Sequence, residues 1–445
     1  MKKIFISLLS ILFALVSVAQ ENILQSGPMV GYSDFREALI WVQTTEAAEV
    51  KIGYFAEKEE EKYTETVQST KAGDFIVKLK PKEVDYGKTY TYKLYLNNTY
   101  VHRDYKLEFQ TQALWQFRSE PPDFKMAFGS CSFINEKIDD RPDPYGDQYQ
   151  IFNSILDKDP DLMLWGGDNM YLRVPDFMTE TGIRHRYRHT RATPEMQALL
   201  GSVHHYATWD DHDYGPNNAD RSYANKRIAE NTFNDYWGNL NTDAAGVGGV
   251  TQHFAWNDVE FFMLDNRYHR APNGDPNTDK EYLGKEQLDW LIDALTKSSY
   301  NTTFKIVING GQIISDVAEF ENYATYPKEH AELLQRLHDA KIEGVIFISG
   351  DRHHTEVSRM ERERAYPLID ITCSPLTAGT HEPRDEGNSY QVKDKTFYNR
   401  NFGIMEITGE RKERVLLLSI YDSDGNKAFD YEIKASDLRY PKGKG

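Results

Sequence analysis

Apolar and polar side chains alternate along the first quarter of the chain. Val50, Ile52 and Tyr54 are separated by polar or small residues, and the same period of two returns in residues 90–97. Alternation of this kind is typical of half-buried β-strands. Short strands separated by turn-rich pieces, without helical stretches, predict a small β-sandwich over residues 23–114.

The pattern changes after a polar, proline-containing linker at residues 118–123. Apolar runs of four to six residues now alternate with segments of helical period. Leu288, Leu291, Ile292 and Leu295 follow the i, i+3, i+4, i+7 spacing of a helix with one buried face. The alternation of apolar strands with helices predicts a layered α/β domain.

The N-terminus has the pattern of an export signal. Lys2 and Lys3 precede an apolar run over residues 4–18, and small residues lead up to Gln20. This pattern predicts a secretory signal peptide, residues 1–19, cleaved after Ala19. The run is short for a membrane anchor. We therefore expect a periplasmic or extracellular protein whose mature chain has no transmembrane segment.

Composition and charge narrow the function classes. The 445 residues are 40% hydrophobic, and the formal net charge is −17. An acidic chain repels phosphate backbones, which argues against a protein that wraps nucleic acid. A small anionic substrate remains compatible, because the local charge of a pocket decides its binding. The two cysteines are too few for a disulfide framework.

One basic segment stands out in this acidic chain. Residues 184–191 hold four arginines and two histidines. They could form a cationic rim that attracts phosphate esters, or a solvated helix face paired with nearby acids.

Reactive side chains follow the predicted strands of the α/β domain. Six apolar runs end directly before such groups, which are Cys131, Asp168 with Tyr171, Asp211 with His212, Arg267 with Arg270, Gln312, and Asp351 with His353. In open α/β sheets, ligands bind outside the carboxyl ends of the strands. The sequence therefore predicts one site at this edge.

Metal ions would explain why so many acids meet there. Gathered carboxylates repel one another unless cations lie between them. Two metals about 3.5–4 Å apart, as phosphatases and nucleases use, would relieve this repulsion.

These motifs, read in order, resemble those of the PhoD-like alkaline phosphatases, a calcineurin-type metallophosphoesterase branch related to purple acid phosphatases. The resemblance rests on G-S-C-S, G-D-x-x-Y, W-D-D-H-D-Y-G, L-D-x-R and S-G-D-R-H, and covers residues 22–435. It implies an α/β metallophosphoesterase domain at residues 123–437, with β-sheets flanked by helices. A small immunoglobulin- or fibronectin-like sandwich at residues 22–115 would precede it.

The resemblance also implies roles for single residues. Cys131 and Tyr171 would bind a ferric iron, and Asp168 would bridge two metals. Asp211 would be a further ligand, and Asp351 and His353 would bind the second metal, calcium or else zinc or manganese. His212 would be catalytic, and Arg267 and Arg270 would hold the substrate phosphate. The roles of Gln312, Asn217 and Asn218 stay open, because each departs from the family pattern.

The leading hypothesis is an exported phosphoesterase in which a metal-bound hydroxide attacks phosphate mono- or diesters. It would be an alkaline-phosphatase-type phosphoric ester hydrolase. One alternative is a phospholipase-D-like phosphodiesterase that acts on lipid headgroups. Another, of a different class, is a surface-binding protein with a structural metal site. The physiological substrate and the oligomeric state are not readable from the sequence.

Overall fold

The computed structural model describes residues 23–298 and 301–441, so the predicted signal peptide lies outside the described residues. The chain divides into two compact units. The first extends to Leu114 and adds residues 191–205 and 235–238, and the second contains the rest. Within the described ranges, no helix has the length and apolar character needed to cross a membrane.

The first unit is built mainly from short antiparallel strands in two sheets. One sheet has the order β1-β2-β6; the other has the order β4-β3-β7-β8, with β5 on β3 and β9 on β7. The strands are β1 (Leu24–Ser33), β2 (Ala38–Thr44), β3 (Glu49–Phe55), β4 (Lys62–Tyr63), β5 (Val67–Gln68), β6 (Ile76–Leu79), β7 (Thr89–Leu96), β8 (Thr99–Val101) and β9 (Glu108–Gln110). The alternation predicted this face correctly, because Val50, Ile52 and Tyr54 are buried in the core between the sheets.

Two later segments of the chain complete this unit. Helix α4 (Gln197–Ser202) packs near β1, and the short η2 (Pro194–Met196) packs against α4. The Tyr92 hydroxyl donates to the carbonyl of Gly201 at 2.8 Å, and the Trp41 indole N–H donates to the carbonyl of Asp235 at 2.9 Å. Both bonds satisfy polar atoms of otherwise buried aromatic rings.

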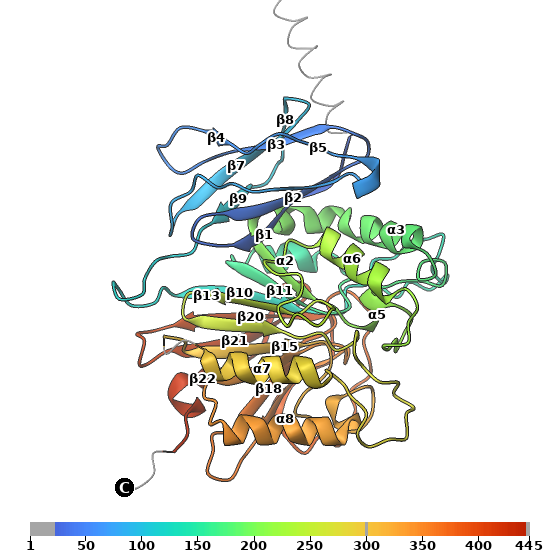
Figure 1. Ribbon diagram of the computed structural model, residues 1–445, viewed down its shortest axis with the longest axis vertical. Coiled ribbons are helices and arrows are strands. Elements are labelled where there is room, and N and C mark those ends of the chain that lie inside the picture. Colours follow the sequence, from blue (N-terminus) through green and yellow to red (C-terminus); the bar gives the residue numbers. More distant parts are fainter. Residues whose placement is uncertain (1–22, 299–300, 442–445) are drawn as a thin grey trace, which may run out of the picture. The chain divides into compact units, whose positions relative to one another are not determined.

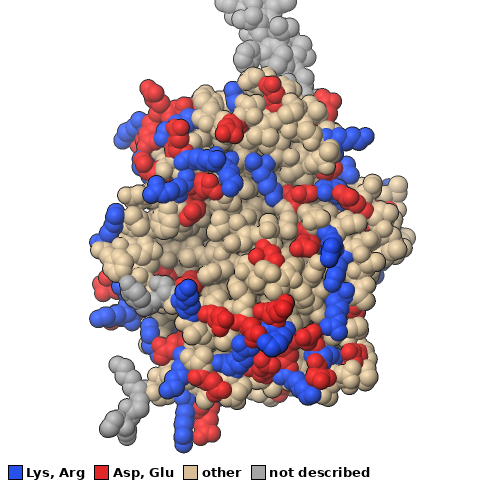
Figure 2. All heavy atoms as spheres, viewed as in Figure 1, with Lys and Arg blue, Asp and Glu red and all other residues tan. Residues whose placement is uncertain are grey.

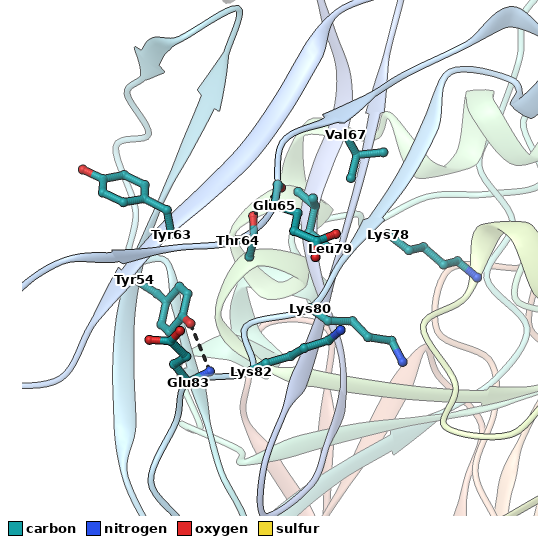
Figure 3. A pocket seen from close by; sticks show the side chains of 10 residues that line it. All are labelled: Tyr54, Tyr63, Thr64, Glu65, Val67, Lys78, Leu79, Lys80, Lys82 and Glu83. Carbon is teal, nitrogen blue, oxygen red and sulfur yellow. Dashed lines mark hydrogen bonds between the residues drawn. The ribbon is translucent and has the colours of Figure 1, made fainter.

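A cavity of about 300 Å³ opens beside strand β6. Lys78, Lys80 and Lys82 line one part of it, and Tyr63 stands on another (Figure 3). Strand β6 is at the edge of its sheet, and lysines with a nearby proline are a common protection of edge strands against pairing with other chains. The alternation Lys-Leu-Lys-Pro-Lys from Lys78 onward therefore has an ordinary structural explanation.

Stability should fall in mild acid because of one buried histidine of this unit. His204 accepts from the N–H of Gln110 at 3.0 Å and donates from Nδ1 to the carbonyl of Gly31 at 2.7 Å. Burial lowers the pKa of His204 from 6.5 to about 4. Its contribution is therefore complete above pH 6.5 and is lost as the pH falls towards 4, by about 3 kcal/mol.

Thermal unfolding of the wild type and of His204→Gln at pH 7.5 and pH 4.5 measures this effect. Glutamine can keep one donor and one acceptor but cannot take up a proton. The variant should lose less stability than the wild type between the two pH values. Equal losses would show that His204 is not the sensitive group.

The second unit contains two larger sheets (Figure 1). The six-stranded sheet has the order β12-β11-β10-β20-β21-β22, and the seven-stranded sheet has the order β13-β14-β15-β16-β18-β17-β19. The strands are β10 (Phe124–Gly129), β11 (Leu162–Gly166), β12 (His204–Thr208), β13 (Gln252–Trp256), β14 (Val259–Met263), β15 (Phe304–Asn309), β16 (Val345–Ser349), β17 (Thr355–Met360), β18 (Leu368–Thr372), β19 (Gln391–Phe397), β20 (Asn401–Thr408), β21 (Val415–Asp422) and β22 (Lys427–Lys434). Strand pairs β10–β11, β14–β15 and β15–β16 are parallel.

Helices cover these sheets, as predicted for a layered α/β domain. Helix α2 packs near β20, and α7 packs on β14 through Trp290 and Phe262. The helices are α2 (Ile151–Leu156), α3 (Glu180–Arg191), α5 (Asp211–Tyr214), α6 (Lys226–Tyr236), α7 (Lys285–Lys297) and α8 (Pro327–Asp339), with shorter η3 (Tyr323–Thr325) and η4 (Ala435–Leu438), while the short η1 (Lys71–Gly73) belongs to the first unit. Helix α7 is the one predicted from its spacing, and all four of its apolar positions are buried.

Candidate metal centre

The predicted site residues follow neighbouring strands in each of the two sheets. In the six-stranded sheet, β10 leads to Cys131, β11 to Asp168 and Tyr171, and β12 to Asp211 and His212. In the seven-stranded sheet, β14 leads to Arg267, β15 to Gln312, and β16 to Asp351 and His353. Several of these residues meet where the strand ends of the two sheets approach each other.

Two glycines allow this close approach. A Cβ atom on Gly350 would lie 2.4 Å from the hydroxyl of Ser130, and one on Gly310 would lie 2.5 Å from the carboxyl carbon of Asp210. Any side chain at either position would push the two sheets apart. The N–H of Gly350 also donates to the carbonyl of Gly310 at 2.8 Å.

The backbone is held in the left-handed region at four predicted ligands. The φ angles are 59° at Cys131, 51° at Asp168, 67° at Asp351 and 53° at His353. Such conformations cost roughly 1–3 kcal/mol each in residues other than glycine, and they concentrate at functional sites. These left-handed conformations lower the stability of the fold, and they occur where the strands lead into the site.

A first group of donors gathers around Cys131. Its Sγ lies 3.8 Å from Oδ2 of Asp168, and the Tyr171 hydroxyl lies 3.3 Å from Nε2 of His353. Nδ1 of His353 is 2.5 Å from the carbonyl of Gly379, so the ring proton belongs on Nδ1. Nε2 is then an acceptor, which takes the Tyr171 O–H here and could bind a metal in its place, as in a metal-binding histidine.

A second group consists of carboxylates. Ligand atoms of Asp210, Asp211 and Asp351 all lie within 4.8 Å of one another, and so do those of Asp168, Asp211 and His212. Oδ2 of Asp210 and Oδ1 of Asp211 are buried and have no hydrogen-bond partner. Buried carboxylate oxygens without donors are costly unless a cation satisfies them. These residues therefore fit a metal ion.

The electrostatics of the two groups agree with this interpretation. Burial, and then repulsion by Asp211 and Asp210, raises the pKa of Asp168 well above its usual range. Burial, followed by the charges of Asp168 and Asp351, likewise raises the pKa of the Cys131 thiol. Cations would stabilise the ionised forms of both residues and reverse these shifts.

Asp211 already has partners that stabilise its charge. Burial opposes ionisation, but His212, Arg267 and the N–H of Asn218 together lower the pKa of Asp211. The Asn218 N–H donates to Oδ2 at 2.6 Å, while the Asn217 amide binds only the Asn218 side chain among the described residues. The Asn218 side chain is exposed, so its backbone takes part in the site more clearly than its amide.

The structure separates two residues that we expected to bind the same metal. His353 lies beside Tyr171 in the first group, whereas Asp351 lies with Asp210 and Asp211 in the second. Both residues have a left-handed backbone after β16, with Arg352 between them. Gln312 binds Glu356 at 2.5 Å and Thr372 at 3.0 Å, which occupies its amide N–H donors away from both groups.

The two arginines expected to hold the substrate phosphate are buried and paired with acids of the protein. The Arg267 side chain is only 1% exposed and is paired with Asp210 and Glu321, and Arg270 is fully buried against Glu321. Acids of the protein therefore occupy most of the Arg267 guanidinium and part of that of Arg270, which makes direct phosphate binding by either a weaker hypothesis.

Three residues of this region were not assigned a role in the sequence analysis. Asp210 directly precedes Asp211, so the doubled acid was a usable signal. Tyr145, whose hydroxyl lies 3.1 Å from Nδ1 of His353, and Glu321 come from irregular segments. No spacing pattern connects such segments with strand ends.

The arginine-rich segment forms helix α3 and is paired with acids. Arg184 binds Glu180 at 2.8 Å, and the buried Arg186 contacts Glu136, Asp139 and Asp176. This arrangement favours the structural interpretation over a phosphate-attracting rim. Cys373 is buried as expected, and both cysteines are free thiols.

Comparisons with known proteins agree with this geometry. The profile of the PhoD-like phosphatase family matches residues 126–415, and a domain of unknown function, DUF7800, matches residues 21–114. Alkaline phosphatase D of Bacillus subtilis (strain 168) is 20% identical over 287 residues. That alignment covers 54% of this chain and 47% of the relative, so the chain spans about half the length of this curated relative.

Solved structures show the same fold. The structure of PhoD superposes with a TM-score of 0.74 at 15% identity, covering 94% of this chain and 92% of that chain. The purple acid phosphatase PPD1 from yellow lupin seeds gives a TM-score of 0.64 at 14% identity, covering 92% and 74%. The second unit therefore has a metallophosphoesterase-type α/β fold.

Proposed function

This chain belongs to the PhoD-like phosphatase family, and from that premise we propose that it is an exported, metal-dependent phosphoesterase acting on phosphate mono- or diesters. The main support is the meeting of a thiol, a phenol, an imidazole and several carboxylates at the strand ends of two sheets. Buried carboxylate oxygens without protein donors make cations the natural completion of this site.

The two groups of donors suit different ions. Cys131, Tyr171 and His353 would hold the first ion, for which we propose Fe³⁺, because thiolate and phenolate offset the charge of a trivalent cation. Asp210, Asp211 and Asp351 would hold the second, for which we propose Ca²⁺, since calcium prefers carboxylate oxygens. Zinc or manganese are alternatives for that position. Asp168 lies beside both groups and would bridge the ions.

Bound together, the cations would supply Lewis acidity and lower the pKa of a coordinated water. The side chains of the protein then orient and assist the reaction. The His212 ring packs against Tyr171 with centroids 4.2 Å apart and ring planes tilted by 32°, and its backbone N–H donates to Asp168 at 3.2 Å. The ring is partly exposed, so it could reach a substrate and protonate the leaving oxygen.

The negative charge of a phosphate ester would have to be compensated by positive charge within the site. On the face drawn in Figure 2, acidic and basic side chains are interspersed, and the chain as a whole carries a net charge of −17. Attraction of a phosphate ester would then depend on the cations themselves.

Comparing a phosphate monoester with a phosphate diester as substrates tests the proposed phosphoesterase activity. The metal-loaded protein should release p-nitrophenol from p-nitrophenyl phosphate, and a chelator should abolish the release. Faster cleavage of the bis-p-nitrophenyl ester would favour the phosphodiesterase or phospholipase-D-like alternative. Hydrolysis of neither ester would favour a surface-binding protein with a structural metal site.

The proposed iron should give the protein a visible colour. Thiolate and phenolate ligands on ferric iron are expected to produce a charge-transfer absorption band. Tyr171→Phe should shift or bleach this band and leave the circular dichroism spectrum unchanged, whereas Tyr440→Phe, remote in the sequence, should leave it in place. A colourless, active protein that contains only zinc would refute the iron assignment.

We also propose the domain organisation expected from the sequence. A signal peptide at residues 1–19 would direct export, and an immunoglobulin-like domain at residues 22–115 would precede a catalytic domain at residues 123–437. The matched ranges 21–114 and 126–415 support these boundaries. The two sheets of the first unit support a sandwich.

A further inference from the structure

Glu321 joins two buried arginines behind the carboxylates of the second group. Its Oε2 lies 3.0 Å from Nη2 of Arg267, and its Oε1 lies 3.2 Å from Nη1 of Arg267 and 3.2 Å from Nη2 of Arg270. The Glu321 side chain is 8% exposed, and its backbone has a left-handed φ of 66°. One carboxylate is therefore shared by two guanidinium groups.

Four of the five N–H donors of Arg267 are engaged by the protein, and the fifth, on Nη2, faces Asp211. Nε donates to Oδ1 of Asp210 at 2.5 Å, and Nη1 donates to the carbonyl of Ala219 at 3.3 Å and to Glu321. Nη2 donates to Glu321 and lies 3.9 Å from Oδ1 of Asp211. A phosphate clamp presents open N–H groups to its ligand, and this guanidinium instead binds the protein around it.

The same contacts fix the carboxylates beside it. Oδ1 of Asp210 accepts from Arg267 and from the Asn266 amide at 2.8 Å, which leaves Oδ2 as the atom without a donor. Asp211 is held by the Asn218 N–H through Oδ2, which leaves its Oδ1 in the same condition. Each acid thus has one oxygen that accepts hydrogen bonds and one that accepts none, although Oδ1 of Asp211 also lies 3.9 Å from Nη2 of Arg267.

We propose that Arg267 is a positioning residue for the second cation and not a substrate clamp. With Glu321 as its counter-ion, it holds Oδ1 of Asp210 by a hydrogen bond and attracts Oδ1 of Asp211 by charge, so that Oδ2 of Asp210 and Oδ1 of Asp211 face a cation together with Asp351. This inference rests on the proposed function, because it concerns the second metal of the same site. It assigns Asp210 as a ligand and Glu321 as the residue that orients Arg267.

Two measurements, the affinity for Ca²⁺ and the inhibition by inorganic phosphate, distinguish a positioning residue from a substrate clamp. The full chain, freed of divalent ions, is titrated with Ca²⁺ by calorimetry, and inorganic phosphate is then measured as a competitive inhibitor at saturating metal. Glu321→Gln removes the counter-charge at nearly constant shape, and Arg267→Lys removes the bidentate geometry while keeping the charge. Glu319→Gln, an exposed position in the same loop, is the matched control.

We expect Glu321→Gln and Arg267→Lys to weaken Ca²⁺ binding by about 10–100-fold, as loss of groups that orient metal ligands typically does. The inhibition constant of phosphate at saturating Ca²⁺ should change by less than about twofold, and the control should match the wild type. Circular dichroism confirms folding, and if one variant fails to fold, the other carries the test.

Other results would overturn the inference. Weaker phosphate inhibition with unchanged Ca²⁺ affinity would make Arg267 a substrate clamp, and unchanged values for both would leave it no role in the site. A wild-type protein that binds neither iron nor any divalent ion would instead refute the proposed function.

Discussion

Asp168→Ala is expected to remove bound metal and to abolish turnover. Asp168 is fully buried between the two donor groups, with one oxygen 3.8 Å from the Cys131 sulfur and the other accepting the N–H of His212. In the proposed site it is the ligand common to both metals, and alanine offers no replacement. Two cations together contribute several kcal/mol to the stabilisation of the transition state. Their loss should lower kcat by roughly 10³-fold or more.

Metal analysis and turnover of the same preparation test this expectation. Asp157→Ala, an exposed residue after helix α2, is the matched control and should retain metal and activity. The variant is expected to stay folded, because removing one of several mutually repelling buried carboxylates relieves strain. An Asp168→Ala protein with two metals and normal turnover would mean that Asp168 is not the bridge.

Much of the fold and part of the site could be predicted because their signals are local. The alternation at Val50 and Ile52 and the helical spacing from Leu288 each lie within one element, and a strand end carries its reactive residues with it. Cys131, Asp168 and Tyr171 were placed correctly next to strands for this reason.

The features that could not be predicted from the sequence depend on contacts between segments that are distant in the chain. Nothing near Arg267 in the sequence indicates that Glu321, from another loop, occupies its guanidinium. Asp351 and His353 are two positions apart and yet have different neighbours, which come from other segments of the chain and are not encoded near β16. The addition of residues 191–205 to the first unit also requires tertiary contacts that no periodicity reveals.

Catalytic assistance by His212 should be separable from metal binding. The His212 ring packs against Tyr171, and it is partly exposed beside Asp168 and Asp211. A side chain that protonates the leaving oxygen typically contributes about 10²–10⁴-fold to the rate. His212→Ala should therefore lower kcat by that factor, with both metals bound and KM little changed.

The choice of leaving group makes the assignment of His212 specific. An aryl phosphate with a very acidic phenol needs little protonation, so its hydrolysis should suffer least in His212→Ala, while an alkyl phosphate should suffer most. His338→Ala, at an exposed helix end, is the control and should leave both substrates unaffected. Equal losses on both substrates, with full metal content, would assign His212 to charge stabilisation instead of proton transfer. Loss of a metal would make it a ligand, and the proton donor would then have to be sought among the other groups near the site, first at His354.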